Sequence, residues 1–237
     1  MEKLNIGYLI DSLDQEQLRV TCTAIIDREF YIEKKLLFQN KHVGSFEVLM
    51  LLSKQSRDQS PVIIGLHGHG QSAEKFEEEF FVEDLVKQGF SFIIPSFRAM
   101  GLTETEYIIS KRLLLNGFTL SGLRVFETLL VEKYLMTLNY LDQDKIGLMA
   151  HSGGSSIASF ITVLSPLIKV KVVDFESSFI DTTDLYGIYD EIIPDLVDSA
   201  QTIHNYPITE GFKKLKVPYG YINSKQKVVD FFKKHLK

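Results

Sequence analysis

Ala150-His151-Ser152-Gly153-Gly154 lies between an apolar run, residues 145–149, and a helix-compatible segment, residues 155–161. The pattern predicts a strand, a sharp turn with Ser152 at its apex, and a helix, because only small residues fit on both sides of such an apex. Ser152 is therefore a candidate nucleophile. A serine that only caps a helix in a glycine-rich turn gives the same short pattern, so this motif alone leaves both interpretations open.

The bulk composition is that of a soluble globular protein. The 237 residues are 45% hydrophobic and 24% charged, so we expect residues 1–237 to form a single α/β domain. The net charge of −5 gives no electrostatic basis for binding nucleic acid or an anionic membrane. We see neither a signal peptide nor a segment of membrane-spanning length. The single cysteine, Cys22, leaves no partner for an intrachain disulfide and fits a cytoplasmic location.

Strand-like and helix-like patterns alternate along most of the chain. Residues 12–28 have helical spacing, and residues 31–38 and 46–52 are predicted to form an opening pair of antiparallel strands. Strands that alternate with helices predict a mostly parallel, doubly wound sheet with helices on both faces. The later strands and helices are expected at residues 61–67, 73–88, 90–95, 120–140, 145–149, 155–161 and 170–175.

A second candidate for a catalytic role is the loop His67-Gly68-His69-Gly70, which follows the predicted strand 61–67. In acyl-transfer enzymes, a loop in this place turns backbone N–H groups toward the developing oxyanion, and the residue after the nucleophile adds another N–H. The expected donors are the backbones of His69 and Gly153. A flexible turn with incidental histidines, or a metal site at both histidines, explains the same residues, but no Asp or Glu stands at ligand spacing. We expect no metal and no cofactor.

Four stretches, in this order along the chain, resemble the α/β-hydrolase fold and, within it, the dienelactone-hydrolase and acetyl-xylan-esterase-like branch. These stretches are residues 67–70, 95–101, 114–122 and 144–154. Four ordered motifs are far more specific than any one alone. The resemblance implies a serine hydrolase that acts on small-molecule carboxylic esters through an acyl-enzyme, with Ser152 as nucleophile. It also implies that Arg98 stabilises loops near the site by charge-assisted hydrogen bonds, although an ordinary surface arginine stays possible.

The C-terminal part departs from the pattern of that branch. Residues 216–222 begin like the penultimate strand, yet residues 224–237 already have the spacing of the final amphipathic helix. A late strand, a helix and a loop are therefore expected to be missing. No Gly-Xaa-Asp follows Ile222, and Tyr221 or Asn223 stands near where a Gly-His pair is sought. The usual catalytic acid and histidine base are absent.

A serine hydroxyl is a weak nucleophile without a base to take its proton. Among the six histidines, His204 is the candidate replacement base, because its segment resembles one that precedes the penultimate strand in the same branch. Asp174 or Glu176, at the end of the predicted strand 170–175, is the candidate orienting acid. In the opposing interpretation, His204 is a hydrogen-bonded loop residue and the two carboxylates only cap a strand end. Residues 177–206 form a possible lid.

Three functional interpretations follow from these observations. The first is an active esterase. The second is a catalytically impaired protein of the same fold with a binding or structural role. The third is a site completed by a partner subunit, in a homo-oligomer formed through the sheet edge that the missing elements leave exposed.

Overall fold

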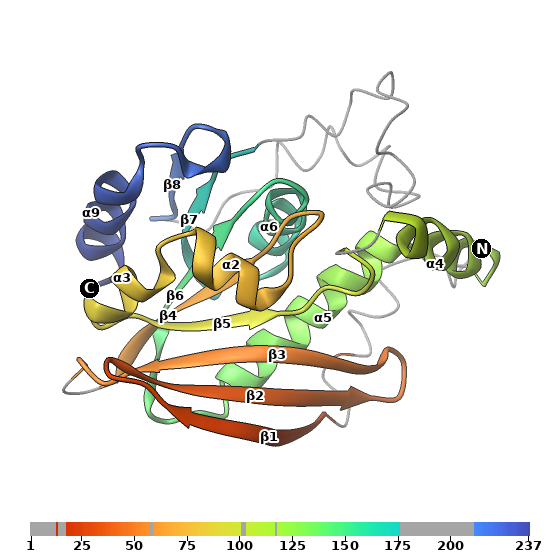
Figure 1. Cartoon of the computed structure of the whole chain (residues 1–237), viewed down its shortest axis with the longest axis horizontal. Helices are drawn as coiled ribbons and strands as arrows, with labels where there is room; N and C mark the ends of the chain where they lie inside the picture. Colours follow the sequence, from red (N-terminus) through yellow and green to blue (C-terminus); the bar gives the residue numbers. More distant parts are fainter. Residues whose placement is uncertain (1–12, 14–17, 57–58, 101–102, 117, 176–210) are drawn as a thin grey trace.

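One mixed sheet of eight strands organises the molecule (Figure 1), in the order β1-β2-β3-β5-β4-β6-β7-β8. The structure, a computed structural model, describes residues 13, 18–56, 59–100, 103–116, 118–175 and 211–237. The strands are β1 (Arg19–Asp27), β2 (Tyr31–Asn40), β3 (Gly44–Ser53), β4 (Ser60–Leu66), β5 (Ser91–Pro95), β6 (Leu141–Ala150), β7 (Ile168–Val173) and β8 (Lys213–Lys216).

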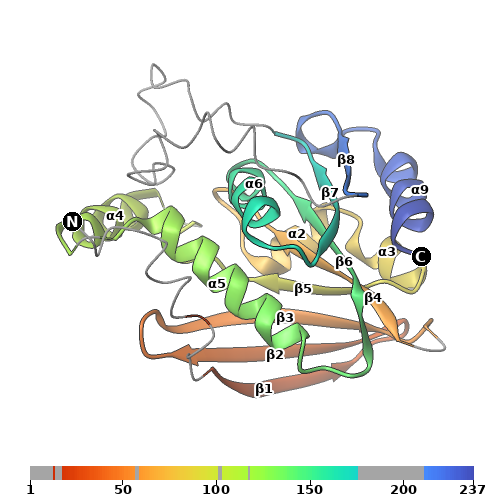
Figure 2. The same ribbon diagram turned by 180° about the vertical axis from the view of Figure 1, so that it is seen from behind.

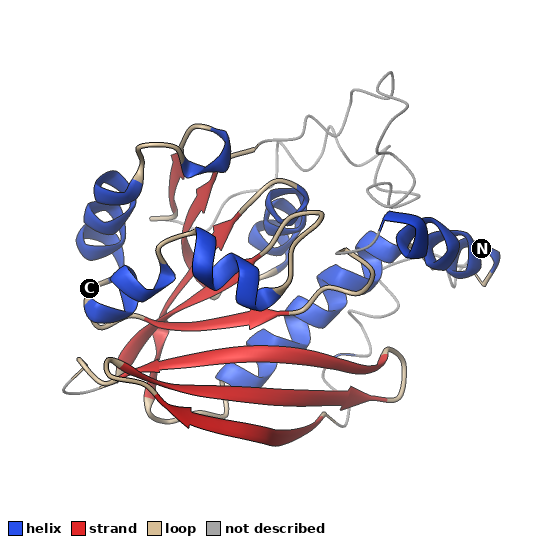
Figure 3. Cartoon of the chain, viewed as in Figure 1, coloured by secondary structure: helices blue, strands red, loops and turns tan. Residues whose placement is uncertain are grey.

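The sheet has an antiparallel part and a parallel part (Figure 3). β1, β2 and β3 pair antiparallel, and β3 also pairs antiparallel with β5. From β5 through β4, β6 and β7 to β8, all pairs are parallel. The prediction of a mostly parallel sheet with antiparallel strands at its N-terminal end is confirmed.

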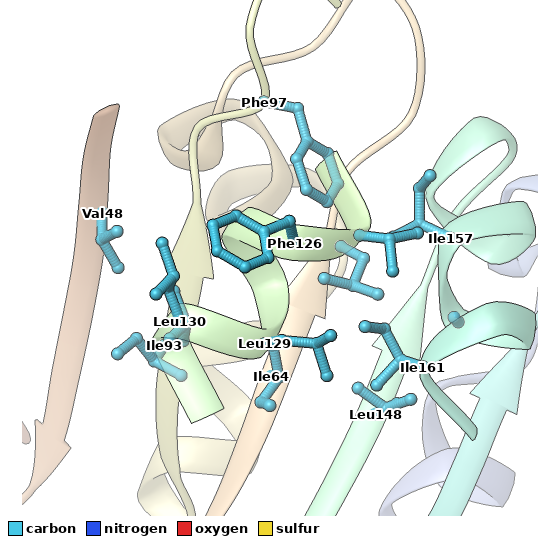
Figure 4. Close-up of a cluster of buried hydrophobic side chains, with 14 of the residues drawn as sticks. Val48, Ile64, Ile93, Phe97, Phe126, Leu129, Leu130, Leu148, Ile157 and Ile161 are labelled. Atoms are coloured by element: carbon cyan, nitrogen blue, oxygen red, sulfur yellow. The ribbon is translucent and has the colours of Figure 1, made fainter. Parts of the chain in front are cut away.

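Helices cover both faces of the sheet, as predicted (Figures 1 and 2). α5 and α6 pack on one face, where Phe126 and Ile157 join a cluster of buried side chains (Figure 4). α2, α3 and α9 pack on the other face, where Phe76 and Phe232 belong to a second cluster. The helices are α2 (Ala73–Glu79), α3 (Val82–Lys87), α4 (Thr103–Leu115), α5 (Leu120–Leu135), α6 (Gly153–Leu164), the 3-10 helix η3 (Tyr219–Tyr221) and α9 (Lys225–Leu236). Within the described ranges, no helix is long and apolar enough to cross a membrane.

The predicted helix over residues 12–28 is wrong where the structure describes it, because Arg19–Asp27 form the strand β1. This stretch is rich in β-branched residues, which pack well on a pleated surface. Eight of the nine residues of β1 pair with β2, with a bulge at Thr23, and this pairing outweighs the helical spacing of the polar positions. The N-terminal antiparallel unit therefore has three strands and not two.

Two other boundaries also differ from the predictions. The expected helix 73–88 is divided into α2 and α3, because Phe81 has a left-handed backbone with φ of 45° and breaks the helical path. The strand expected over residues 216–222 lies earlier, at β8, and the chain turns into η3 after Pro218. Proline has no N–H group to donate to the neighbouring strand, so the strand ends there.

The carboxyl ends of four neighbouring parallel strands lie at one edge of the sheet. β4 ends at Leu66, β6 at Ala150, β7 at Val173 and β8 at Lys216. Open α/β sheets bind their ligands at this edge, where the loops after successive strands meet. The residues that follow these strands therefore form the candidate site.

Candidate active site

Ser152 occupies a strained turn between β6 and α6. Its backbone dihedrals are φ 47° and ψ −121°, a region that residues with a side chain rarely adopt. A Cβ atom at Gly154 would collide with the carbonyl group of Leu66 in β4, so only glycine fits there. Ser152 makes no capping hydrogen bond through its side chain. Ser152 thus stands at the N-cap position of α6 but does not cap the helix through its side chain, and its hydroxyl contacts Tyr219 instead.

The loop after β4 lies directly against this turn. A Cβ atom at Gly68 would come within 2.9 Å of the Ser152 Cβ atom, and one at Gly153 within 2.5 Å of the His69 Cε1 atom. The structure thus brings together Ser152, His69 and Gly153, three of the four predicted site residues. The fourth, His204, lies outside the described residues, as do Glu176 and the possible lid 177–206.

Gly153 is well placed to donate a hydrogen bond. It is the first residue of α6, so its backbone N–H has no acceptor within the helix. The positive end of the helix dipole lies at the same point and favours negative charge. The His69 ring packs against Gly153, and its Nε2 atom lies 3.3 Å from Glu106 Oε1. An oxyanion that forms near Ser152 Oγ would meet this end of α6.

Asp174, the first residue after β7, connects the serine turn to the C-terminal segment. One oxygen of its buried carboxylate accepts the backbone N–H of Ser152 at 3.0 Å. The other oxygen accepts the backbone N–H of Gly220 at 2.7 Å and lies 2.5 Å from His151 Nδ1. Because the carboxylate only accepts, His151 donates from Nδ1. Asp174 therefore accepts hydrogen bonds from the backbone of the serine turn, from the backbone of Gly220 and from the ring of His151.

The hydroxyl of Tyr219, in η3, lies 3.1 Å from Ser152 Oγ. Its side chain is 58% exposed, and its ring is tilted by 50° to the ring of His151, with the two ring centroids 5.1 Å apart. Sequence reasoning pointed to Tyr221 or Asn223 near this position and missed Tyr219. The available signal was the pair Tyr219-Gly220, which stands before the last helix where a histidine and a glycine were sought.

His67 connects the loop after β4 to the loop after β5. Its Nε2 atom accepts the backbone N–H of Phe97 at 2.9 Å, so its Nδ1 atom carries the proton and faces the Gly68 carbonyl at 3.0 Å. Burial lowers the pKa of His67 to about 4, which keeps the ring neutral. Within the described ranges, no three His, Cys, Asp or Glu side chains are grouped so that they could hold a metal ion.

A buried group of charges lies behind the His67–Gly70 loop. Arg98 Nε lies 2.6 Å from Glu127 Oε1, and its guanidinium donates to the Ser45 carbonyl at 3.1 Å. Arg124 lies 2.5 Å from Glu106, which also faces His69, and donates to the Arg98 carbonyl at 2.8 Å. Arg98 thus contacts β3 through the Ser45 carbonyl and α5 through the Glu127 carboxyl group. Complete burial raises the pKa of Glu127 to about 7, against the effect of both arginines.

Comparisons with known proteins agree with this architecture. A curated relative named "Putative hydrolase YtaP", from Bacillus subtilis strain 168, is 22% identical over 175 residues, which cover 68% of this chain. The match spans 58% of that relative's length. No family model matches the chain.

Solved structures match over nearly the whole chain. A crystal structure named as a putative acetyl xylan esterase from Bacteroides fragilis has a TM-score of 0.72 and 15% identity, and it covers 97% of this chain and 86% of its own. An acetyl xylan esterase from Paenibacillus sp. R4 has a TM-score of 0.70 and 10% identity. The match covers 99% of this chain and 94% of the esterase chain. Together with the sheet order and the strained serine turn, these likenesses show that the chain has the α/β-hydrolase fold.

Proposed function

We propose that the chain is a serine hydrolase that acts on small-molecule carboxylic esters, with Ser152 as the nucleophile. The observation that carries this proposal is the strained conformation of Ser152, with φ 47° and ψ −121° and no capping bond for its side chain. Strain of this kind costs about 1–3 kcal/mol and persists where function requires the geometry. A serine with only a structural role has no need of it.

The neighbouring backbone supports the same chemistry. Ser152 Oγ attacks the ester carbonyl carbon, and the carbonyl oxygen becomes an oxyanion that accepts the N–H of Gly153 at the start of α6. In this proposal the backbone of His69, in the loop that lies against the serine turn, supplies the second donor. The ester C–O bond then breaks, the alcohol leaves with a proton, and water hydrolyses the acyl-enzyme to release the acid.

The proposal predicts covalent labelling that depends on Ser152. The purified chain is incubated with a fluorophosphonate probe and, separately, with p-nitrophenyl acetate, because acetyl esters are named for the two similar structures. We expect labelling and turnover in the wild type and neither in Ser152→Ala. Ser159→Ala is the matched control, since Ser159 lies on the same helix with its hydroxyl bonded to the Ser155 carbonyl. Labelling that persists in Ser152→Ala would overturn the proposal.

His204, oriented by Asp174 or Glu176, is one proposed source of the catalytic base. In this arrangement Asp174 would share its carboxylate between His204 and its present partners, His151, Gly220 and Ser152. The test is His204→Ala, and turnover equal to that of the wild type would exclude His204.

One observation favours a second candidate function, a binding protein without catalytic activity. In the part of the chain that the structure describes, no histidine is hydrogen-bonded to Ser152 Oγ. Absence of both labelling and turnover in the wild type would support this candidate. Turnover found only in an oligomeric fraction from size-exclusion chromatography would instead support a site completed by a second subunit.

A further inference from the structure

We propose that Tyr219 is the residue that exchanges the proton with Ser152 Oγ, in the place where a serine hydrolase ordinarily uses histidine. This inference rests on the proposed function of Ser152. The Tyr219 hydroxyl lies 3.1 Å from Ser152 Oγ, and no other side chain in the described ranges hydrogen-bonds to that oxygen. The distance is within the range over which a proton is transferred between a nucleophile and its base.

The segment that carries Tyr219 is fixed on both sides. Gly220, with φ of 69°, donates its backbone N–H to Asp174, and the same carboxylate accepts the N–H of Ser152. The buried Tyr221 places its hydroxyl 2.7 Å from the Ala150 carbonyl, at the end of β6. Tyr221 also has a positive φ, 57°, which is strained for a residue with a side chain. These contacts position Tyr219 over the serine turn.

The histidines in the described part of the chain have other contacts. His151 is bonded to Asp174, the Nε2 atom of His67 accepts the Phe97 N–H, and His69 Nε2 faces Glu106. His42 lies in the hairpin between β2 and β3, and His235 lies on α9 beside Phe231. Tyr219 is therefore the titratable side chain that the structure places against Ser152 Oγ.

The chemistry needs no group beyond the enzyme, the ester and water. The phenolate oxygen of Tyr219 accepts the Ser152 hydroxyl proton while Oγ bonds to the carbonyl carbon. The phenol then gives this proton to the departing alkoxide as the ester C–O bond breaks, which leaves an acyl-enzyme and an alcohol. In the second half, the phenolate takes a proton from the attacking water and returns it to Oγ when the acyl–Oγ bond breaks.

The pH dependence separates a tyrosine from a histidine. A phenol gives up its proton at higher pH than an imidazole, about 10 against about 6.5 in peptides. A tyrosine-dependent acylation rate therefore continues to rise above the pH at which a histidine-dependent rate has levelled off. The described titratable groups that face Tyr219 are His151, through a tilted contact between the two rings, and Asp174, through the N–H of Gly220.

The test measures the acylation burst with p-nitrophenyl acetate from pH 6 to pH 10 in the wild type and in Tyr219→Phe. We expect the wild-type rate to rise throughout the alkaline range, and Tyr219→Phe to lose about 100-fold or more in kcat together with that rise, with KM little changed. Tyr140→Phe is the matched control, because Tyr140 is also partly exposed but lies just before β6, at the opposite end of the strand from Ser152. This control should keep the wild-type profile.

Incorporation of 3-fluorotyrosine at position 219 adds a readout that a structural role would not change. Fluorine makes the phenol more acidic, so the alkaline rise should move to lower pH without loss of the burst. A burst in Tyr219→Phe with wild-type rate and profile would overturn the role of Tyr219 while Ser152 keeps its role. The absence of any Ser152-dependent burst or labelling in the wild type across this pH range would overturn both proposals.

Discussion

At the scale of single residues, the conformation of Ser152 is the feature with the clearest energetic consequence. A φ of 47° with ψ of −121° is unfavourable for any residue that carries a Cβ atom, whereas glycine adopts such backbones without steric cost. Ser152→Gly should therefore be more stable than Ser152→Ala, by about 1 kcal/mol, although both variants lose the hydroxyl and glycine has the greater unfolded-state entropy. Urea unfolding of the two variants measures this difference directly. Equal stability would show that the turn is not strained.

The position of Ser152 was predictable, and its partner was not. Small residues on both sides of the serine are a local requirement of the turn, so they are visible within five residues of sequence. The contact with Tyr219 joins residues 67 positions apart and depends on where β8 and η3 lie beside β7. No spacing rule encodes such a contact. The pairing of His151 with Asp174 escaped sequence reasoning for the same reason, since 23 residues separate them.

At the scale of secondary structure, Asp174 connects three elements. It follows β7, accepts the Ser152 N–H at the start of α6, and accepts the Gly220 N–H in η3. Asp174→Asn replaces one accepting oxygen by an amide that can only donate, so at least one of these buried partners loses its acceptor. We expect a loss of about 2–4 kcal/mol in the free energy of unfolding. Turnover should also fall, because Tyr219 loses the contact that positions its segment.

Asp230→Asn is the control for Asp174→Asn. Asp230 is exposed on α9, where it accepts from Gln226 at 2.9 Å. This exchange should leave the urea midpoint close to that of the wild type, because exposed pairs contribute little. A midpoint for Asp174→Asn that equals that of Asp230→Asn would contradict the connecting role of Asp174.

The elements themselves were predictable where one physical signal dominates. The buried strand β4 and the long helix α5 were expected near their observed bounds, because apolar runs and helical spacing are strong local signals. The spacing of apolar residues gave the wrong prediction for β1. Its exposed positions resemble those of a polar helix, and the strand forms because it pairs with β2. The sequence pattern also misplaced β8, because Lys213–Lys216 can be recognised as a strand only from its pairing with β7.

The exposed sheet edge proposed as a place for oligomer contact corresponds to β8, the last strand in the sheet order. Three of its four residues are lysine, and the strand is short. Edge strands with lysine resist pairing with another chain, since the charges repel and are costly to bury. The composition of β8 therefore argues against an oligomer formed through this edge.

At the scale of the whole molecule, α5 carries buried carboxyl groups that link stability to pH. Burial raises the pKa of Glu132 from 4.5 to about 7, opposed by the hydrogen bond from Ser165, and the pKa of Glu127 is raised to about 7 as well. The folded state therefore holds these protons more tightly than the unfolded chain does. The resulting stabilisation is fully present below pH 4.5 and is lost as the pH rises through 7, so these two groups make the free energy of unfolding fall between these values.

Glu132→Gln isolates this effect, because glutamine keeps an oxygen that can accept from Ser165 and has no charge at any pH. The variant should match the wild type near pH 4.5 and exceed it at pH 8 by as much as about 3 kcal/mol in the free energy of unfolding. Glu83→Gln is the control, since Glu83 forms a solvent-exposed pair with Lys87 on α3 and should shift stability little at either pH. Urea unfolding of the three proteins at both pH values measures these differences in the free energy of unfolding. If Glu132→Gln differs from the wild type by the same amount at pH 4.5 and at pH 8, the carboxyl group does not titrate between them, and the pH dependence of stability must come from other groups.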